Sequence, residues 1–299
     1  MSTHSNNVLE APDASSGTGS PTDPYRVVIR ASRGWPLLQL GAVWEYRELL
    51  YFLVWRDVKV RYKQTALGMF WVVLQPLVSI AMFTFLFGVL LQVPSGEAPY
   101  PVFALAALLP WNYFASSLMR SSVSVVGSAN LITKVYFPRL VIPLAGVLSG
   151  LVDLAISFII LLGLMAFYRL TPTAAVVWLP LMILLAMVTA LSFGLWLSAL
   201  NVRFRDVNHL MPFLIQVWMY ATPVVYGASL IPEPFRIVMG LNPMTGVVEG
   251  FRWALLGGQA GHTGLSGTLI VVSSGISLLV LVGGVYFFRA TERSFADII

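Results

Sequence analysis

The sequence has no cysteine and very little charge, and both shortages restrict what the protein can be. Zero cysteines among 299 residues exclude a disulfide framework and thiolate metal sites. Only 10% of the residues are charged, 58% are apolar, and the mean hydropathy is +0.81. Soluble domains average roughly 25% charged and about 45–50% apolar residues. The composition therefore excludes an ordinary soluble protein and indicates an integral membrane protein.

Sequence signatures of catalysis are also missing. The chain contains no nucleotide-binding P-loop, no H-E-x-x-H, no G-x-S-x-G and no D-x-D pair. The three histidines are scattered along the sequence, which argues against a metal site: His4, His209 and His262. We expect a chain with no catalytic residue, no metal and no cofactor of its own.

One carboxylate, Asp153, is predicted at membrane depth, with Ser149 and Ser157 one helical turn away on either side. Two interpretations stay open: a residue that lines a cavity or subunit interface, or a buried acid satisfied by the nearby hydroxyls. The sequence alone indicates no basic partner for this acid. Because proton-coupled transport needs ionisable groups inside the spans, an ion-coupled transporter is disfavoured.

Hydrophobic runs predict an all-α integral membrane protein with six transmembrane helices. The stretch between Lys63 and Glu97 alone contains 33 uncharged residues, and an α-helix needs roughly 20 residues to cross a bilayer. Turns rich in proline, glycine or charge separate the runs. The predicted spans are about 66–91, 100–119, 140–168, 174–200, 210–230 and 268–288.

The positions of lysine and arginine predict the orientation. With the N-terminus in the cytoplasm, the six spans place 15 of the 18 basic residues inside and 3 outside, as the positive-inside rule requires. We expect a multi-pass membrane protein with both termini in the cytoplasm. The pI of about 9.6 then reflects loops beside anionic membrane lipids, with no nucleic acid as partner.

Four regions are predicted along the chain. Residues 1–34 are polar and read as a disordered cytoplasmic tail. Residues 35–64 have charges at a period near 3.6 and predict an N-terminal amphipathic helix on the cytoplasmic interface. Residues 65–290 form the transmembrane domain, and 291–299 a cytoplasmic C-terminal end. Residues 231–267, before the last span, are too apolar for a solvated loop and predict a re-entrant helical pair.

Aromatic residues and one loop carry further signals with two interpretations each. Aromatic side chains in and beside spans one, two and five either form an interfacial belt and core, or line a passage and stack on sugar rings. The loop "SSVSVVGSANLITKVYFPRLVIP" is either a helix offered to a cytoplasmic motor or an ordinary basic loop. Gly146 and Gly150 form a G-x-x-x-G suited to close helix contact.

Five motifs in order are "RDVKVRYKQTALGMFWVVLQPL", "KVYFPRLVIP", "NVRFRDV", "ATPVVY" and "LNPMTGVVEGFRWALLG". In order and spacing they resemble the ABC-2 type permeases that export polysaccharides, namely the O-antigen, capsule and teichoic-acid exporter subunits. The resemblance covers about residues 35–290, and the long tail before it is the main departure.

The resemblance implies partners and a cargo. A second copy of the chain would form a homodimer, and two copies of a cytoplasmic ABC ATPase would supply ATP and Mg on a separate chain. A lipid-linked polysaccharide, on an undecaprenyl pyrophosphate carrier, would enter a channel at the dimer interface. This agrees with the missing P-loop, because the transport subunit then needs no nucleotide site.

The resemblance also implies roles for particular residues. A channel path would use Phe70, Trp71, Trp218, Tyr220 and Tyr226, and Lys59, Arg61 and Lys63 would lie where the carrier phosphates sit. Coupling to the ATPase would use Asn130, Lys134, Tyr136 and Arg139, in the segment around Val125–Pro138. Glu249 and Arg252 would form a pair in the external gate region.

The function that we expect is export of a lipid-linked polysaccharide, with O-antigen favoured, in lipopolysaccharide biosynthesis and sugar transport. One alternative is an ABC-2 exporter of another substrate, such as teichoic acid, capsule or a small molecule. A second is a multi-span membrane enzyme of lipid-linked sugar synthesis. That enzyme would need an acidic or histidine-containing site near the membrane surface, and the sequence indicates none.

Overall fold

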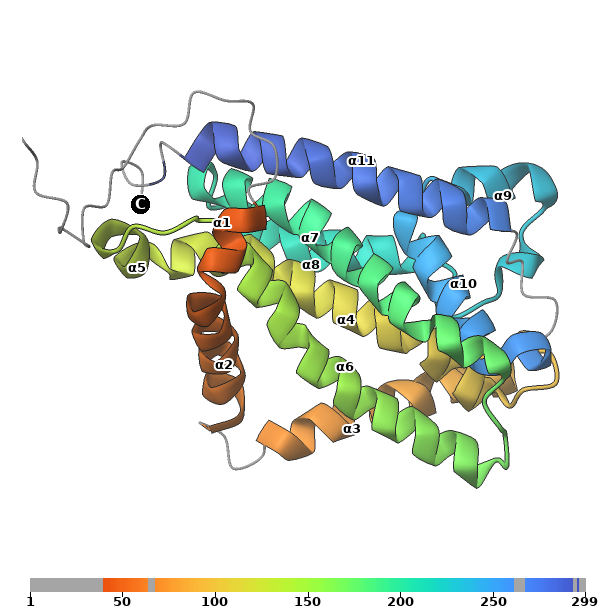
Figure 1. Cartoon of the computed structure of the whole chain (residues 1–299). Coiled ribbons are helices and arrows are strands. Elements are labelled where there is room, and N and C mark those ends of the chain that lie inside the picture. The colour runs from red at the N-terminus through yellow and green to blue at the C-terminus, as the bar shows by residue number, and fades with distance from the viewer. Residues whose placement is uncertain (1–39, 64–67, 261–266, 293–294, 296–299) are drawn as a thin grey trace, which may run out of the picture. The chain divides into compact units, whose positions relative to one another are not determined.

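The computed structural model describes residues 40–63, 68–260, 267–292 and Phe295, all within one compact unit that spans Pro36–Ile299. Within these ranges every regular element is a helix (Figure 1). The predicted all-α class is therefore confirmed for the described chain. The predicted tail, residues 1–34, lies outside the described residues, as does most of the C-terminal end.

The N-terminal helix is built from two pieces, α1 (Leu40–Glu45) and α2 (Arg47–Lys63), which are separated at Tyr46. In Figure 1, α2 runs transverse to the long helix α11 (Gly267–Glu292). Leu53 is only 1% exposed and packs α2 onto the bundle, whereas Tyr51 and Trp55 are exposed. One side of α2 therefore belongs to the protein core, and the other presents aromatic side chains outward.

The first long apolar segment combines α3 (Gly68–Phe83) with a π-helical stretch, η1 (Thr84–Leu90). η1 lies close to the start of the next helix, α4 (Tyr100–Gly127). A Cβ added at Gly88 would be 3.1 Å from the ring of Tyr100. A larger residue at this position would therefore have to displace the Tyr100 ring by a few tenths of an ångström, so glycine suits the close approach of η1 and α4.

Helix α4 is the centre of the bundle. In its most apolar stretch 78% of the residues are buried, against 17–33% in the other candidate spans. It packs along α6 (Val141–Phe167) and α7 (Leu179–Arg203), and α11 packs on α7. Small residues permit these contacts: a Cβ at Gly146 would be 3.2 Å from the backbone nitrogen of Ser121, and one at Gly194 would collide with the Ser121 hydroxyl. The G-x-x-x-G prediction of a close helix contact is thereby confirmed.

Five helical segments among the described residues are long and apolar enough to cross a membrane: Val73–Leu90, Tyr100–Gly127, Val141–Phe167, Ala174–Arg203 and Gly267–Glu292. The predicted span 210–230 corresponds to α8 (Val207–Tyr220), which has 14 residues and ends in a turn well before residue 230. The sequence Thr222-Pro223 explains the end, because proline disfavours helical backbone at the residue before it and has no N–H.

Two further helices lie between α8 and α11, namely α9 (Glu233–Gly240) and α10 (Pro243–Leu256). Apart from the half-buried Trp253, every residue of α10 is buried, and the helix packs against α4, α7 and α11. Asn242 caps its N-terminus, because its side chain accepts a hydrogen bond from the Met244 N–H at 3.1 Å. Gly257, with φ 54°, ends it in a conformation that favours glycine.

A second, smaller apolar core lies at the end of the bundle that carries α5 (Ala129–Lys134). Leu53 of α2, Ile132 of α5 and Phe137 are buried there, together with residues from the ends of α4, α6, α7 and α11. This core places α2 and the segment after α4 in one packed unit.

Candidate functional site

Asp153 on α6 connects three helices. Its Oδ1 accepts a hydrogen bond from the Tyr62 hydroxyl of α2 at 2.6 Å. Its Oδ2 accepts from Arg61 Nη1, also on α2, and from Arg120 Nη1 on α4 at 3.4 Å. The intramembrane acid therefore has two basic partners, which the sequence alone does not indicate because they are 92 and 33 residues away. We name Asp153, Arg61, Tyr62 and Arg120 the Asp153 junction.

Arg120 is held by α4 and α6 as well as by the acid. Its Nη2 donates to the hydroxyls of Ser116 at 3.1 Å and Ser117 at 3.2 Å, and its Nε donates to the carbonyl of Gly146 at 3.2 Å. Any Cβ at Gly150 would collide with this guanidinium and with Ser117. The predicted second span ends at residue 119, but α4 continues to Gly127, so Arg120 lies inside the helix beside the acid.

Among the described residues, neither the Ser149 nor the Ser157 hydroxyl forms a hydrogen bond with Asp153. Ser149 donates to the Gly146 carbonyl of its own helix at 3.0 Å, and both oxygens of Asp153 are taken by α2 and α4 side chains. Burial and the hydrogen bond to Asp153 raise the pKa of Tyr62 to about 12. The phenol therefore keeps its proton at neutral pH and acts as a donor.

The three basic residues predicted beside carrier phosphates differ in their surroundings. Lys59 and Lys63 are exposed on α2. Arg61 is paired with Asp153, and its side chain is 25% exposed. The two lysines are thus available to an anion outside the chain, whereas Arg61 is already engaged by an acid of α6.

The predicted external pair, Glu249 and Arg252, is buried. The two side chains are 1% and 0% exposed, and Arg252 Nη1 lies 2.9 Å from Glu249 Oε1. Nη1 also donates to the carbonyls of Pro223 at 2.7 Å and Tyr226 at 2.9 Å. Glu249 Oε1 accepts from the N–H of Ala228 at 3.2 Å.

The same guanidinium also packs on an aromatic ring. Its Cζ lies 3.9 Å from the centre of the Phe103 ring of α4, a cation–π distance. Arg252 and Glu249 therefore hold the segment after α8 against α10 and α4. We name this group the α10 clamp.

Asn242 is a second connection in the same region. Its Oδ1 accepts from the indole N–H of Trp218 at 2.9 Å, and its Nδ2 donates to the Thr222 hydroxyl at 2.8 Å. Asn242 is not among the site residues predicted from the sequence. The Asn-Pro at 242–243 was the available signal, since an N-cap residue followed by proline is typical of a helix start.

The predicted channel aromatics are not equivalent. Trp218 is committed to packing: its ring makes edge contacts with Phe114 at 5.0 Å and Phe193 at 4.7 Å. Tyr226 is half-buried and donates to the carbonyl of Tyr220 at 3.2 Å, while Tyr220 itself is 57% exposed. Phe70 and Trp71 belong to α3, but their side chains lie outside the described residues.

The predicted coupling residues are mostly on the surface. Asn130 and Lys134 of α5 are exposed, and Tyr136 is 78% exposed. Arg139 is half-buried, with its guanidinium 5.9 Å from the ring centre of Phe295. Because Ile132 and Phe137 are buried in the second core, this segment is anchored by its apolar residues and displays its polar ones.

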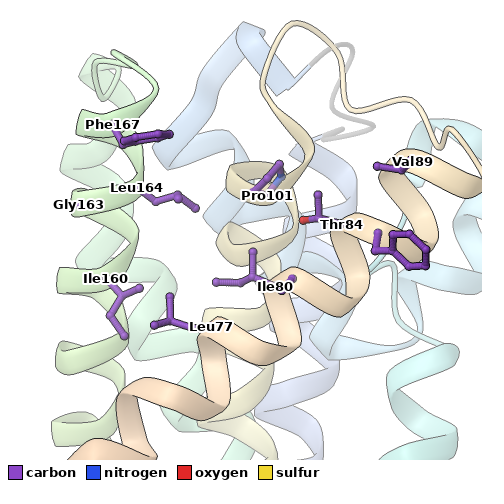
Figure 2. A pocket seen from close by; sticks show the side chains of 11 residues that line it. Leu77, Ile80, Thr84, Val89, Pro101, Ile160, Gly163, Leu164 and Phe167 are labelled. Atoms are coloured by element: carbon purple, nitrogen blue, oxygen red, sulfur yellow. The ribbon is translucent and has the colours of Figure 1, made fainter.

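An apolar groove of about 510 Å³ lies where α3, η1, the start of α4 and the end of α6 meet (Figure 2). Thr84 is the only lining residue with a polar side chain. The lining is made by Leu77, Ile80, Ala81, Thr84, Phe85, Val89, Pro101, Ile160, Gly163, Leu164 and Phe167. Such a surface suits a hydrocarbon chain and offers no group for chemistry.

The chemistry available in the described residues is ionic and hydrogen-bonding. Within those residues no three His, Asp or Glu side chains gather as metal ligands. Asp153 pairs with arginines of two other helices, and Glu249 pairs with Arg252 within α10.

The family model described as "ABC-2 type transporter" matches residues 48–256. The O-antigen export system permease protein RfbA of Klebsiella pneumoniae is 31% identical over 253 residues, which cover 84% of this chain and 95% of that protein. Its namesake from Myxococcus xanthus is 32% identical over 214 residues, covering 70% and 81% of the two chains. The polysialic acid transport protein KpsM of Escherichia coli is 21% identical over 240 residues, covering 80% and 92%.

Proposed function

Because this chain belongs to the ABC-2 type transporter family, we propose that it is the transmembrane permease subunit of an ATP-driven exporter of a lipid-linked polysaccharide, with O-antigen as the favoured cargo. The single observation that carries this proposal is the identity of 31–32% to two O-antigen export permeases over most of their length. Identity to the polysialic acid transporter is lower, at 21%, which makes capsule the second candidate cargo.

Loss of the protein from its host tests this function. Depletion is expected to remove the polysaccharide from the cell surface and to leave its lipid-linked form in the cytoplasmic leaflet, where spheroplasts protect it from an added glycosidase. Re-expression of the chain restores the surface polymer. Unchanged surface polysaccharide after complete depletion would overturn the proposal, and loss of capsule alone would transfer it to the second cargo.

The membrane architecture is part of the proposal. The five candidate spans are joined by a sixth crossing, made by the 14-residue helix α8 together with the chain that follows it, and α9 with α10 forms a re-entrant pair before the last span. The burial of α10 supports this, because backbone that enters the membrane without crossing it must be covered by protein or water. Six crossings place both termini on the same side, and the basic residues on that side place it in the cytoplasm, with the protein in the bacterial inner membrane.

Two copies of the chain and two copies of a cytoplasmic ABC ATPase complete the proposed exporter. ATP and Mg bind on the ATPase, and this chain acts as a transport subunit. Asn130, Lys134 and Tyr136 are the surface that we assign to the ATPase, with Arg139 at its base. Their exposure beside a buried apolar anchor supports a rigid contact that transmits force.

The carrier and the polymer are assigned to different surfaces. Lys59 and Lys63 on α2 are proposed to meet the carrier phosphates, since both amines are exposed beside the outward aromatic residues of α2. Tyr220, with Phe70 and Trp71, is proposed to contact sugar rings along the path. The exposed amide of Gln216, one turn before Tyr220, supports a face of α8 directed to water or to the second subunit.

Trp218 and Tyr226 are proposed to shape the path from behind, because their rings and polar groups are already bonded within the chain. Glu249 and Arg252 are proposed to hold the external mouth in place as the α10 clamp. In that role they fix the backbone that surrounds the exit, without themselves contacting the polymer.

A further inference from the structure

The Asp153 junction joins the transverse helix α2 to the two central helices of the bundle. We propose that Asp153 is a positioning residue of the transport cycle, which holds α2 against α4 and α6 so that movement of α4 is passed to α2. The proposal rests on the proposed function, since α2 carries the lysines assigned to the carrier phosphates.

The connection runs along a continuous path. Helix α4 ends at Gly127 and is followed directly by α5, which begins at Ala129 and belongs to the segment assigned to the ATPase. Arg120 lies two turns before the end of α4 and contacts Asp153 at 3.4 Å. Asp153 in turn binds Arg61 and Tyr62 on α2. A displacement of α5 therefore reaches α2 through two side-chain contacts.

The attachment of α2 depends on Asp153 more than that of α4 does. Arg120 has three other acceptors, namely two serine hydroxyls and the Gly146 carbonyl. In the described part of the chain, Asp153 is the only acidic side chain that pairs with Arg61. Loss of the carboxylate thus leaves Arg120 bound to α6 and releases Arg61.

Partial exposure makes the junction suitable for movement. The side chains of Arg61, Asp153 and Arg120 are 25%, 23% and 22% exposed, whereas those of the α10 clamp are 0–1% exposed. Side chains with free space around them can rearrange more easily than fully buried ones, whereas a fully buried pair is strongly destabilised when it separates. The two ionic clusters are therefore suited to opposite tasks, one adjustable and one fixed.

A second attachment allows α2 to stay folded without the acid. Leu53 is buried in the second core, one face of α2 packs there, and this contact does not involve Asp153. We therefore expect variants of Asp153 to shift the position of α2 and to leave the chain assembled.

The test uses the full exporter, with its ATPase, in nanodiscs and in cells. Asp153→Asn removes the charge and keeps the size, while Asp153→Glu keeps the charge. We expect Asp153→Asn to lower polysaccharide export per ATP hydrolysed by about fivefold or more, with ATPase activity retained and with Asp153→Glu restoring most of the loss. Arg56→Gln is the matched control, because Arg56 pairs with its neighbour Asp57 on the same helix.

A distance measurement distinguishes a role of Asp153 in positioning α2 from a role in folding. Because the chain has no cysteine, a spin-label pair at Val60→Cys on α2 and Arg203→Cys on α7 reports the position of α2. We expect Asp153→Asn to broaden this distance distribution and Asp153→Glu to restore it. In a double-mutant cycle, Arg61→Gln is expected to add little to Asp153→Asn, because both break one contact.

Three possible results would overturn the proposal or the proposed function. Export per ATP and a distance distribution that match the parent in Asp153→Asn would overturn the proposal. If Asp153→Asn does not assemble, a parent-like result in Arg61→Gln overturns it equally. If the parent protein exports no polysaccharide, the proposed function fails, while the distance measurement still decides whether Asp153 positions α2.

Discussion

Replacing Arg252 by leucine is expected to destabilise the protein strongly, because this guanidinium is the centre of the α10 clamp. The change removes the ion pair to Glu249 at 2.9 Å and the bonds to the carbonyls of Pro223 and Tyr226. It leaves a carboxylate that is 1% exposed without its cation. Breaking a buried ion pair by deleting one partner costs about 3–5 kcal/mol, and we expect the loss to be in that range.

The assay is thermal unfolding of the detergent-solubilised protein, followed by intrinsic fluorescence and by the monodisperse fraction on gel filtration. A loss of this size corresponds to a fall of roughly 10 °C in Tm, taking about 2–4 °C per kcal/mol for a chain of this size. Arg205→Leu, at an exposed site between α7 and α8, is the matched control and is expected to change Tm by only about 1–2 °C.

Replacing both members of the pair is expected to lower Tm less than replacing Arg252 alone. Because replacing both members of a buried ion pair by neutral groups of similar size is often close to neutral, Glu249→Gln with Arg252→Met should recover much of the lost Tm. An Arg252→Leu variant that melts within about 2 °C of the parent would refute the reasoning, since the penalty for an unpaired buried carboxylate would then be absent.

Three shorter predictions follow from other parts of the structure. Gly194→Val is expected to lower Tm, because a Cβ there collides with the Ser121 hydroxyl of α4. Gly163→Ala is the control and should leave Tm unchanged, because a Cβ at that position meets open space. Tyr220→Ala is expected to reduce export of polysaccharide without lowering Tm, since its side chain is 57% exposed; unchanged export would remove it from the proposed path. Because the native chain has no cysteine, single cysteines can report the orientation. Glu97→Cys should react with a membrane-impermeant maleimide in intact spheroplasts, and Lys134→Cys should react only after lysis. The reverse pattern contradicts the proposed orientation.

Most of the helices were predictable from local sequence. A run of apolar residues long enough to cross a bilayer forms a helix wherever it packs, so the segments around α4, α6, α7 and α11 follow from hydropathy. The positions at which the helices end were less predictable. α4 continues past Arg120 to Gly127 because α6 supplies acceptors for that guanidinium, and hydropathy assigns a charged residue to a loop. α8 stops at Tyr220 because of the proline that follows, which the hydrophobic run conceals.

The candidate site residues were predictable as residue types but not as partners. Motif resemblance selected Glu249 and Arg252, and only the fold shows that they are buried and bonded to the backbone after α8. The resemblance implies that Arg61 contacts the carrier phosphates, whereas the fold pairs it with Asp153. Asn242 was not selected, because one asparagine before a proline is a weak signal until Trp218 and Thr222 lie beside it.

By itself the sequence determined that this is a helical membrane protein, which end of each span is basic, and to which family of transporters it belongs. These properties depend on composition, on local periodicity and on motifs that are read residue by residue. Only the tertiary structure decided how Asp153 is neutralised, that Arg252 faces inward, and that α2 is tied to α4 through α6. Each of these depends on side chains that are far apart in the chain, and the free energy of an ionic group in a membrane protein is set by the partner that folding brings to it.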